Sequence, residues 1–214
     1  MNKIIAYSLW GTDPKYTIGA IKNAQGICEL YPEWIGRFYC GQSVPSEIIK
    51  ELEQTPNTEV IVMDEDGDWT GMFWRFLSAD SDDVVLSRDT DSRITQREVD
   101  AVDEWLESDK DFHIMRDHPY HGTQILGGMW GCRNGILKGI SEWMENYTKG
   151  DFWQVDQNFL REMIYPKIQR NTFVHDEFFE KKSFPTKRKS REFVGQAFNE
   201  DDSECETTHG DMVI

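Results

Sequence analysis

The feature of this sequence that most constrains its fold is a regular alternation of short apolar runs with segments of helical periodicity. The runs with the length and residue types of strands are 4–7, 34–40, 59–63, 84–86 and 112–115. The segments between them with helical spacing are 16–31, 46–53, 69–77 and 95–107. Strands separated by helices indicate βαβ units. The sequence therefore predicts an α/β fold with a mainly parallel central sheet flanked by helices.

The second half of the chain is less regular. Residues 137–147 and 155–165 have helical patterns, 172–174 is a short strand pattern, and 122–135 is rich in glycine. Thr95 and Glu98 can form a capping box at the start of the helix before this half.

The length of 214 residues predicts one domain. We place this domain at 1–195, with two halves, 1–94 and 95–195. Residues 196–214 are acidic and polar, which is typical of a tail or a linker, so further domains can follow in a longer protein.

Composition excludes several classes of protein. The 12 Phe, 8 Trp and 7 Tyr supply a real core, and the net charge of −16 argues against binding nucleic acid or an anionic membrane surface. No apolar run is long enough to cross a membrane, and the first 13 residues do not have the pattern of a signal peptide. The four cysteines have no CxxC spacing, which favours a reduced, cytoplasmic protein.

Charge is distributed unevenly along the chain. Residues 64–111 contain 16 acidic and 5 basic side chains, whereas 181–191 contain 6 basic and no acidic side chains. Most of these charges are expected on solvated surface. The asymmetry also fits an acidic cation site beside a basic lip.

The strongest chemical motif is Asp89-Thr90-Asp91, which directly follows the apolar strand at 84–86. Ligands bind at the carboxyl ends of strands in sheets of this type. Mn²⁺ and Mg²⁺ prefer carboxylate and phosphate oxygens, so Asp89 and Asp91 are the predicted metal ligands. Asp64 also follows a strand and is the alternative. The other closely spaced acidic residues are expected to lie in polar turns.

No Gly-rich dinucleotide or P-loop motif occurs in the chain. An alternating first half that closes on a strand and a DxD motif resembles the GT-A fold glycosyltransferases, which are Rossmann-like single domains. The resemblance implies a divalent metal that bridges the diphosphate of a nucleotide sugar, here a UDP-sugar. It also implies that the loop at 7–12, after the first strand, holds the nucleoside, with Tyr7, Leu9 and Thr12 as the selected contacts. The half at 1–94 would then bind the nucleotide, and the half at 95–195 the sugar and the acceptor.

Nearly all of the chain resembles the N-terminal glycosyltransferase domain of the large multidomain proteins that glycosylate the capsids of algal giant viruses. This resemblance implies a glycan or glycoprotein acceptor and a place in the host cytoplasm.

Three further residues match patterns of retaining GT-A enzymes. Arg75 lies 14 residues before Asp89, where such enzymes often carry an arginine close to the donor sugar and diphosphate. His175 and Lys181 keep the offset of an H-x2-G-x2-K pattern, although Phe178 replaces its glycine. The resemblance makes His175 the third metal ligand and Lys181 a phosphate contact, and it favours retention of configuration.

The sugar-binding half offers further candidates. Asp156 begins a predicted helix, where it is either the N-cap or a carboxylate near the anomeric carbon that orients the acceptor or acts as general base. Gln157 follows it. The remaining candidates for sugar contacts are Gly127, Gly128, Trp130 and His118. Trp130 either stacks on a sugar or is buried in a turn, and His118, with Asp117 and His121, is the competing metal site.

Two rival functions remain open. A metal-dependent phosphatase or nucleotidyltransferase uses the same metal, although the early DxDx[TV] of phosphatases is absent. A non-catalytic carbohydrate-binding module is suggested by the many aromatic residues, and it needs neither metal nor nucleotide.

Overall fold

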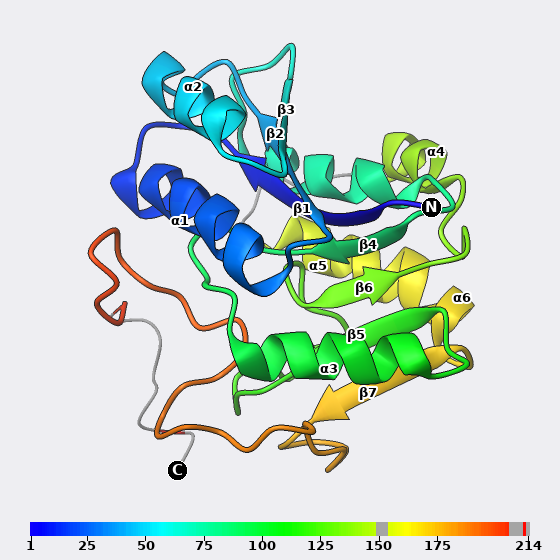
Figure 1. The fold of residues 1–214 in the computed structure, drawn as a ribbon. Helices are drawn as coiled ribbons and strands as arrows, with labels where there is room; N and C mark the ends of the chain where they lie inside the picture. Colours follow the sequence, from blue (N-terminus) through cyan, green and yellow to red (C-terminus); the bar gives the residue numbers. More distant parts are fainter. Residues whose placement is uncertain (149–153, 206–211, 213–214) are drawn as a thin grey trace.

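A seven-stranded sheet forms the centre of the computed structural model, which describes residues 1–148, 154–205 and 212 (Figure 1). The strands are β1 (Lys3–Leu9), β2 (Ile35–Cys40), β3 (Thr58–Val62), β4 (Val84–Ser87), β5 (Phe112–Arg116), β6 (Trp130–Cys132) and β7 (Thr172–Asp176). They lie in the order β3-β2-β1-β4-β6-β5-β7, and β6 alone of these runs antiparallel to its neighbours. The predicted fold class, a single domain with a mostly parallel sheet, is therefore confirmed.

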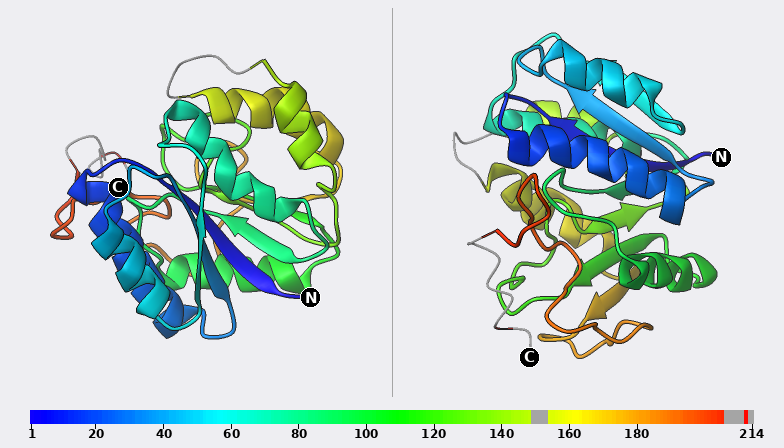
Figure 2. Two further views of the ribbon diagram at one scale, coloured as in Figure 1. Left: turned by 90° about the horizontal axis from the view of Figure 1, so that it is seen from above. Right: turned by 60° about the vertical axis from the view of Figure 1, so that its left-hand side comes forward.

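Helices cover both faces of the sheet, as the two views of Figure 2 show. One face carries α1 (Pro14–Leu30), α2 (Ser46–Gln54) and α3 (Gln96–Glu107). The other face carries η1 (Trp69–Ala79), α4 (Ile140–Asn146), α5 (Val155–Phe159), η2 (Leu160–Ile164) and α6 (Tyr165–Ile168). Each face has its own apolar core.

Strand β1 shows how the sequence produces these two cores. Successive side chains of a strand point to opposite faces. Ile4 and Ala6 pack against η1 and its neighbours, whereas Ile5 and Tyr7 pack against α1 and α3. A central strand that is buried on both faces therefore has the continuous apolar run seen in the sequence.

The structure differs from the predicted elements in three places. The helix expected at 69–77 is a 3₁₀ helix that extends to Ala79. Strand β6 was expected to be part of a Gly-rich loop, because three residues give too short a pattern to recognise. Thr95 caps α3 as predicted, but Glu98 does not close the box, because its carboxylate accepts a hydrogen bond from Arg88 Nε at 2.6 Å.

Part of the predicted acidic tail packs on the domain. Residues 193–205, which we call the strap, pass beside the loop after β4, where Ala197 bridges to Ser92. Asp202 in the strap forms ion pairs with Lys22 and Arg93. The predicted boundary at 195 stays a prediction, and residues 206–211 and 213–214 of the expected tail lie outside the described residues.

The parallel strands all end at the same edge of the sheet, which comes forward in the right view of Figure 2. The loops that leave β1 and β4 meet there, because these two strands are direct neighbours. Sequence segments 80 residues apart are thereby brought to one place.

Two buried histidines link the far strands of the sheet to α3. His113 Nε2 on β5 lies 2.8 Å from His175 Nδ1 on β7, and His175 Nε2 lies 2.9 Å from the Glu104 carboxylate on α3. Trp105 stacks on the His113 ring. Burial lowers the pKa of His113 well below its usual value, and it also lowers the pKa of His175 in spite of Glu104. Both rings are therefore neutral in the folded protein at pH 7.

We expect acid to destabilise the fold through these histidines. Each one is neutral when folded but takes up a proton near pH 6.5 when unfolded, so its stabilising contribution is complete above that pH and is lost below it. The loss is at most about 1.4 kcal/mol per pH unit for each histidine, and His113, whose pKa is lowered further, contributes the larger part. Urea unfolding between pH 7.5 and 5.5 measures it. His113→Phe keeps an aromatic ring against Trp105 but removes one titrating group, so the free energy of unfolding should change less steeply with pH. An unchanged slope in this variant contradicts the prediction.

Candidate active site

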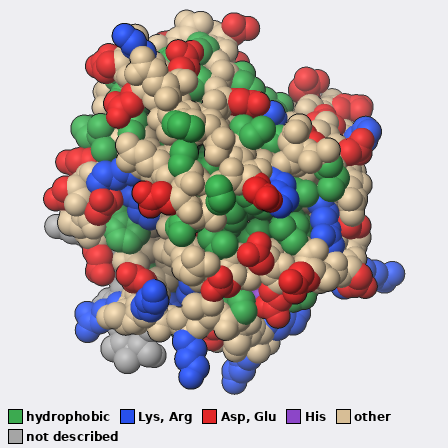
Figure 3. Space-filling model, in the orientation of Figure 1, with side chains coloured by type: hydrophobic (Ala, Val, Ile, Leu, Met, Phe, Trp, Pro, Cys, Tyr) green, Lys and Arg blue, Asp and Glu red, His purple; other side chains and the backbone are tan. Residues whose placement is uncertain are grey.

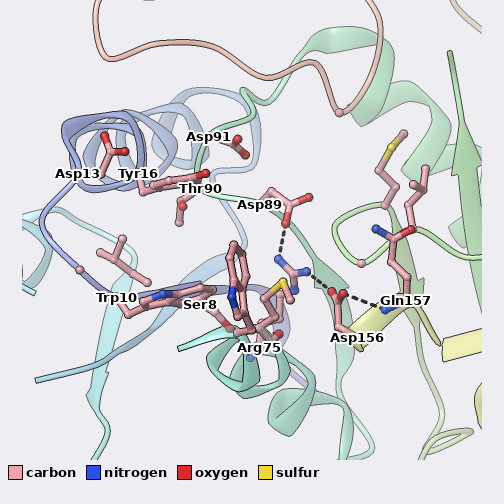
Figure 4. Close-up of a pocket in the computed structure, with 18 of the residues that line it drawn as sticks. Ser8, Trp10, Asp13, Tyr16, Arg75, Asp89, Thr90, Asp91, Asp156 and Gln157 are labelled. Atoms are coloured by element: carbon pink, nitrogen blue, oxygen red, sulfur yellow. Dashed lines mark hydrogen bonds and ion pairs between the residues drawn. The ribbon is translucent and has the colours of Figure 1, made fainter. Parts of the chain in front are cut away.

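A cleft of about 630 Å³ opens at the carboxyl edge of the sheet, and this volume is in the range of small-molecule sites. Its walls come from the loop after β1, the start of α1, η1, the loop after β4, the loop before β6, the start of α5 and the strap. The lining residues are Ser8, Leu9, Trp10, Gly11, Thr12, Asp13, Tyr16, Trp69, Met72, Arg75, Asp89, Thr90, Asp91, His121, Leu126, Gly127, Met129, Asp156, Gln157 and Gly195. Figure 4 shows most of them.

Arg75 occupies the floor of this cleft between two carboxylates. Its backbone N–H donates to Ser8 Oγ at 3.0 Å, which fixes η1 against β1. Its Nη1 donates to the Asp89 carboxylate, and its Nη2 lies 2.9 Å from Asp156 Oδ2 (Figure 4). One guanidinium therefore joins η1, the loop after β4 and the start of α5.

Two glycines make room for this arrangement. A Cβ at Gly127 would overlap the Asp156 carboxylate and Arg75 Nη2, and a Cβ at Gly128 would overlap the Asp89 carboxylate. From the sequence, these glycines were predicted to let a sugar approach the backbone closely. In the structure they admit the side chains of the ion-paired group.

Burial sets the electrostatics of the three side chains. Asp156 is almost fully buried, and burial raises the pKa of its carboxyl although Arg75 opposes the shift. Burial alone would lower the pKa of Arg75, but the two carboxylates outweigh it and raise this pKa. The Asp89 side chain is 45% exposed and is therefore the most accessible of the three side chains to a ligand.

Asp91 lies at the other side of the cleft, next to α1 (Figure 4). Lys15 Nζ pairs with its carboxylate at 2.8 Å. Burial and the nearby Asp89 carboxylate raise the pKa of Asp91, against the effect of Lys15. The two carboxylates of the motif thus repel each other, and a cation between them would relieve the repulsion.

These residues fit a divalent cation that is shared with a ligand. Asp89 and Asp91 supply hard carboxylate oxygens in the same cleft. Within the described residues, however, no group of three or more His, Cys, Asp and Glu is placed to hold a metal ion. Mg²⁺ typically binds through one or two carboxylates plus substrate phosphates. This cleft can supply the carboxylates, and a bound diphosphate would supply the phosphates.

Buried polar contacts hold the loop that carries the DxD motif. Arg88 Nη1 donates to the carbonyls of Ser87 and Trp130, and Arg88 Nε pairs with Glu98. From α1, Asn23 Nδ2 donates to the carbonyl oxygens of Thr90 and Ser92 at 3.0 and 2.9 Å. The loop is therefore fixed from both sides.

Several residues expected from the sequence line the cleft together. They are Leu9, Thr12, Arg75, Asp89, Asp91, Gly127, Asp156 and Gln157. Asp156 does not cap its helix, because the N-cap is Gln154. Gly128 lies directly behind Asp89.

Four other expected contacts lie elsewhere. Tyr7 is fully buried on the α1 side and stacks on Phe38, because an odd position of β1 points away from η1. Trp130 is fully buried in β6 and is therefore the turn-type tryptophan of the two alternatives. Asp64 and Lys181 are exposed and do not line the cleft.

The histidines also lie differently from the expectation. The two ring nitrogens of His175 face His113 and Glu104, so neither is left for a metal ion in the cleft. Its strand is also three strand spacings from β4, or about 14 Å. We therefore do not retain His175 as a metal ligand. His118 is buried against Phe193, and it is His121 that lines the cleft.

Several residues of the cleft wall were not selected from the sequence. Within the loop expected to hold the nucleoside they are Ser8, Trp10 and Gly11, and elsewhere they are Asp13, Tyr16, Trp69, Met72, Leu126, Met129 and Gly195. The alternation of β1 was a usable signal for Ser8 and Trp10, which share the face of Ile4 and Ala6. No local signal places Trp69, whose side chain is exposed in a 3₁₀ helix.

Comparison with known proteins supports the fold. No protein family model and no curated protein matches the chain. A solved glycosyltransferase involved in glycosylation of the major capsid of PBCV-1 matches with 14% identity and a TM-score of 0.52, covering 86% of this chain and 91% of that one.

Two nucleotide-using enzymes are similar to the same degree. A putative glucose-1-phosphate thymidylyltransferase from Bacillus anthracis has 10% identity, a TM-score of 0.52 and coverage of 82% and 87% of the two chains. The 4-diphosphocytidyl-2C-methyl-D-erythritol synthase from Anaerococcus prevotii has 11% identity, a TM-score of 0.50 and coverage of 87% and 94%. At these identities the likeness shows the fold, which is the predicted GT-A, Rossmann-like one.

We expect Arg75→Met to destabilise the protein by about 3–5 kcal/mol at pH 7.5, because it leaves two carboxylates without their buried partner. We expect the loss to become smaller as the pH is lowered towards 5, because burial raises the pKa of the Asp156 carboxyl and the variant removes the Arg75 charge that opposes this shift. Urea unfolding at both pH values measures this. The control is Arg37→Met, which breaks a pair with the half-exposed Glu59 and costs about 1 kcal/mol or less. Equal losses for the two variants would refute the argument.

Proposed function

We propose that this GT-A fold protein is a metal-dependent glycosyltransferase, which moves a sugar from a nucleoside-diphosphate donor to a glycan or glycoprotein acceptor. The observation that carries the proposal is the position of Arg75. It lies at the strand edge of the cleft, between a carboxylate of the DxD motif and the carboxylate that begins α5. This arrangement combines a fixed positive charge with two carboxylates of different accessibility.

The charge of the cleft favours binding of the donor together with a cation. The described lining residues include four carboxylates, of Asp13, Asp89, Asp91 and Asp156, against the guanidinium of Arg75. A diphosphate alone would be repelled by this excess. Asp89 and Asp91 would hold Mn²⁺ or Mg²⁺, which supplies neutralisation of the diphosphate as it departs. The donor that we propose is a UDP-sugar.

Arg75 and Asp156 have separate roles in the proposed transfer. Arg75 adds positive charge where the leaving phosphate gains negative charge. Asp156, which lines the cleft and is held by Arg75 and by the backbone N–H of Gln157 at 2.8 Å, would orient the acceptor hydroxyl. In an inverting reaction it would take the proton of that hydroxyl. We favour retention, in which the departing phosphate takes the proton, because Arg75 matches the pattern of retaining enzymes.

The aromatic side chains of the cleft suit the flat parts of the donor. Trp10, Tyr16 and Trp69 all line it, and Trp69 is 46% exposed. Ring faces of this kind stack on nucleobases and sugars. They stand around the loop after β1, where the nucleoside was expected.

We extend the proposal to the biological setting of the similar capsid glycosyltransferase. The acceptor would be a glycan on a viral capsid protein, modified in the host cytoplasm. Within the described residues, no helix has both the length and the apolar character needed to cross a membrane.

A nucleotidyltransferase is the second candidate, because one of the similar structures is named as a thymidylyltransferase. Such an enzyme takes a nucleoside triphosphate and a sugar phosphate, and it releases pyrophosphate. Incubation with UTP and sugar 1-phosphates, next to incubation with UDP-sugars and oligosaccharides, separates the two functions by their products.

We expect UDP to bind at least about tenfold more weakly in chelator than with Mn²⁺, because the carboxylates of the cleft repel an uncompensated diphosphate. We also expect Mn²⁺ alone to bind weakly, since Arg75 and Lys15 already pair with the two carboxylates. Calorimetry of UDP and Mn²⁺, singly and together, tests both statements. Equal affinity for UDP in the two conditions would remove the metal from the proposal.

We expect Asp89→Asn and Asp91→Asn each to lower transfer by about 10²-fold or more, as loss of one charge-stabilising group does. Asp64→Asn is the matched control, because Asp64 follows β3 but is exposed and outside the cleft. Transfer from UDP-sugars is measured with thermal unfolding of each variant. Near-normal turnover of the double Asn variant, or a comparable loss with Asp64→Asn, would place the site elsewhere.

A further inference from the structure

A basic loop, residues 181–191, connects β7 to the strap. It contains six Lys and Arg and no acidic residue, in a chain with a net charge of −16. The members that are exposed, and that form no ion pair with any residue the structure describes, are Lys181, Lys187, Lys189 and Arg191. Lys and Arg side chains gather along the lower edge of Figure 3, where Figure 1 has β7 and the segment that follows it.

The basic loop is anchored to the domain at several points. Phe184 is buried and lies under the Arg97 guanidinium at 4.2 Å. Arg188 Nη2 pairs with the fully buried Asp117 at 2.7 Å. The Thr186 carbonyl accepts a hydrogen bond from Arg97. The remaining cations therefore project from a fixed backbone.

The exposed cations of the loop are not neutralised by their surroundings. In the part of the chain that the structure describes, no carboxylate lies within 4 Å of the amino or guanidinium groups of Lys181, Lys187, Lys189 or Arg191. The acidic residues next to the loop have other partners: Glu177 pairs with Arg97, and Glu180 with Arg116 and Lys182. Glu192 is exposed at the end of the loop. A local positive potential therefore remains on an acidic protein.

The basic loop leads directly into the wall of the cleft. Gly195, which lines the cleft, follows Arg191 by four residues, a span of about 14 Å at most. Asp117 connects the basic loop to the cleft. Its carboxylate pairs with Arg188, and its backbone N–H donates to His121, which lines the cleft, at 3.0 Å. A ligand that leaves the cleft on this side meets the exposed cations.

We propose that the basic loop binds an anionic group of the acceptor glycan, a carboxylate, sulfate or phosphate that lies some sugar units away from the accepting hydroxyl. The inference rests on the proposed function, because it names the acceptor class of the same site. The acidic charge of the cleft beside the basic loop favours such a glycan over a nucleic acid as the ligand. A polyanion with a charge on every unit would carry phosphates into the acidic cleft, whereas a glycan can place neutral sugars there and its anionic group on the loop.

Binding of oligosaccharides without nucleotide or metal tests the proposal. The probes are one neutral oligosaccharide and its carboxylated, sulfated and phosphorylated forms of equal length, with single-stranded DNA and polyglutamate as competitors. The variant is Lys187→Gln with Lys189→Gln and Arg191→Gln. The control removes three exposed charges away from the loop, through Lys50→Gln, Lys138→Gln and Arg170→Gln.

We expect at least one anionic form to bind more tightly than the neutral one, and the loop variant to lose about tenfold of that affinity while the control keeps it. The form with the greatest loss identifies the anionic group. Equal affinity for neutral and anionic forms, equal losses in both variants, or tighter binding of DNA or polyglutamate would each overturn the proposal. Since binding is measured without a donor, failure here is distinct from failure of sugar transfer.

Discussion

The buried guanidinium of Arg75 is the interaction on which the site depends. Removing a cation from water costs free energy that opposite charges must offset, and here the carboxylates of Asp89 and Asp156 offset it. These carboxylates come from the loop after β4 and from α5, 67 residues apart in the sequence. Their approach in turn requires the absence of a Cβ at Gly127 and Gly128. Side chains from three segments, next to the glycines of a fourth, are thus held in one geometry before any ligand binds.

The charge of the molecule is divided between two regions that adjoin. The cleft is acidic, which suits a cation with a diphosphate, and the basic loop beside it is left unneutralised. A net charge of −16 hides this division, because it averages a local excess of each sign. The anchoring of the loop through Arg188 and Asp117 keeps its cations from folding back onto the carboxylates of the cleft.

The three cleft carboxylates that were identified from the sequence have a common property: each lies at an element boundary that the sequence pattern itself marks. Asp89 and Asp91 follow a strand, and Asp156 begins a helix, so their place at the carboxyl edge follows from the alternation. The residues that lie elsewhere than predicted are those whose surroundings depend on the direction of a side chain or on a partner distant in the sequence. Tyr7 faces the α1 core because of its position in β1, Trp130 belongs to a strand too short to recognise, and His175 is engaged by His113 and Glu104.

The sequence by itself determined the α/β class, the mainly parallel sheet and the edge at which the cleft opens, because these follow from local periodicity and from the chain order of strands and helices. Tertiary structure alone decided which side chains meet in the cleft. The ion pairs of Arg75, the edge-to-face contact of Trp10 with Trp74, and the return of the chain to the cleft wall at Gly195 join residues far apart in the sequence. Such contacts depend on how two layers of helices pack on one sheet, and no local pattern records that packing.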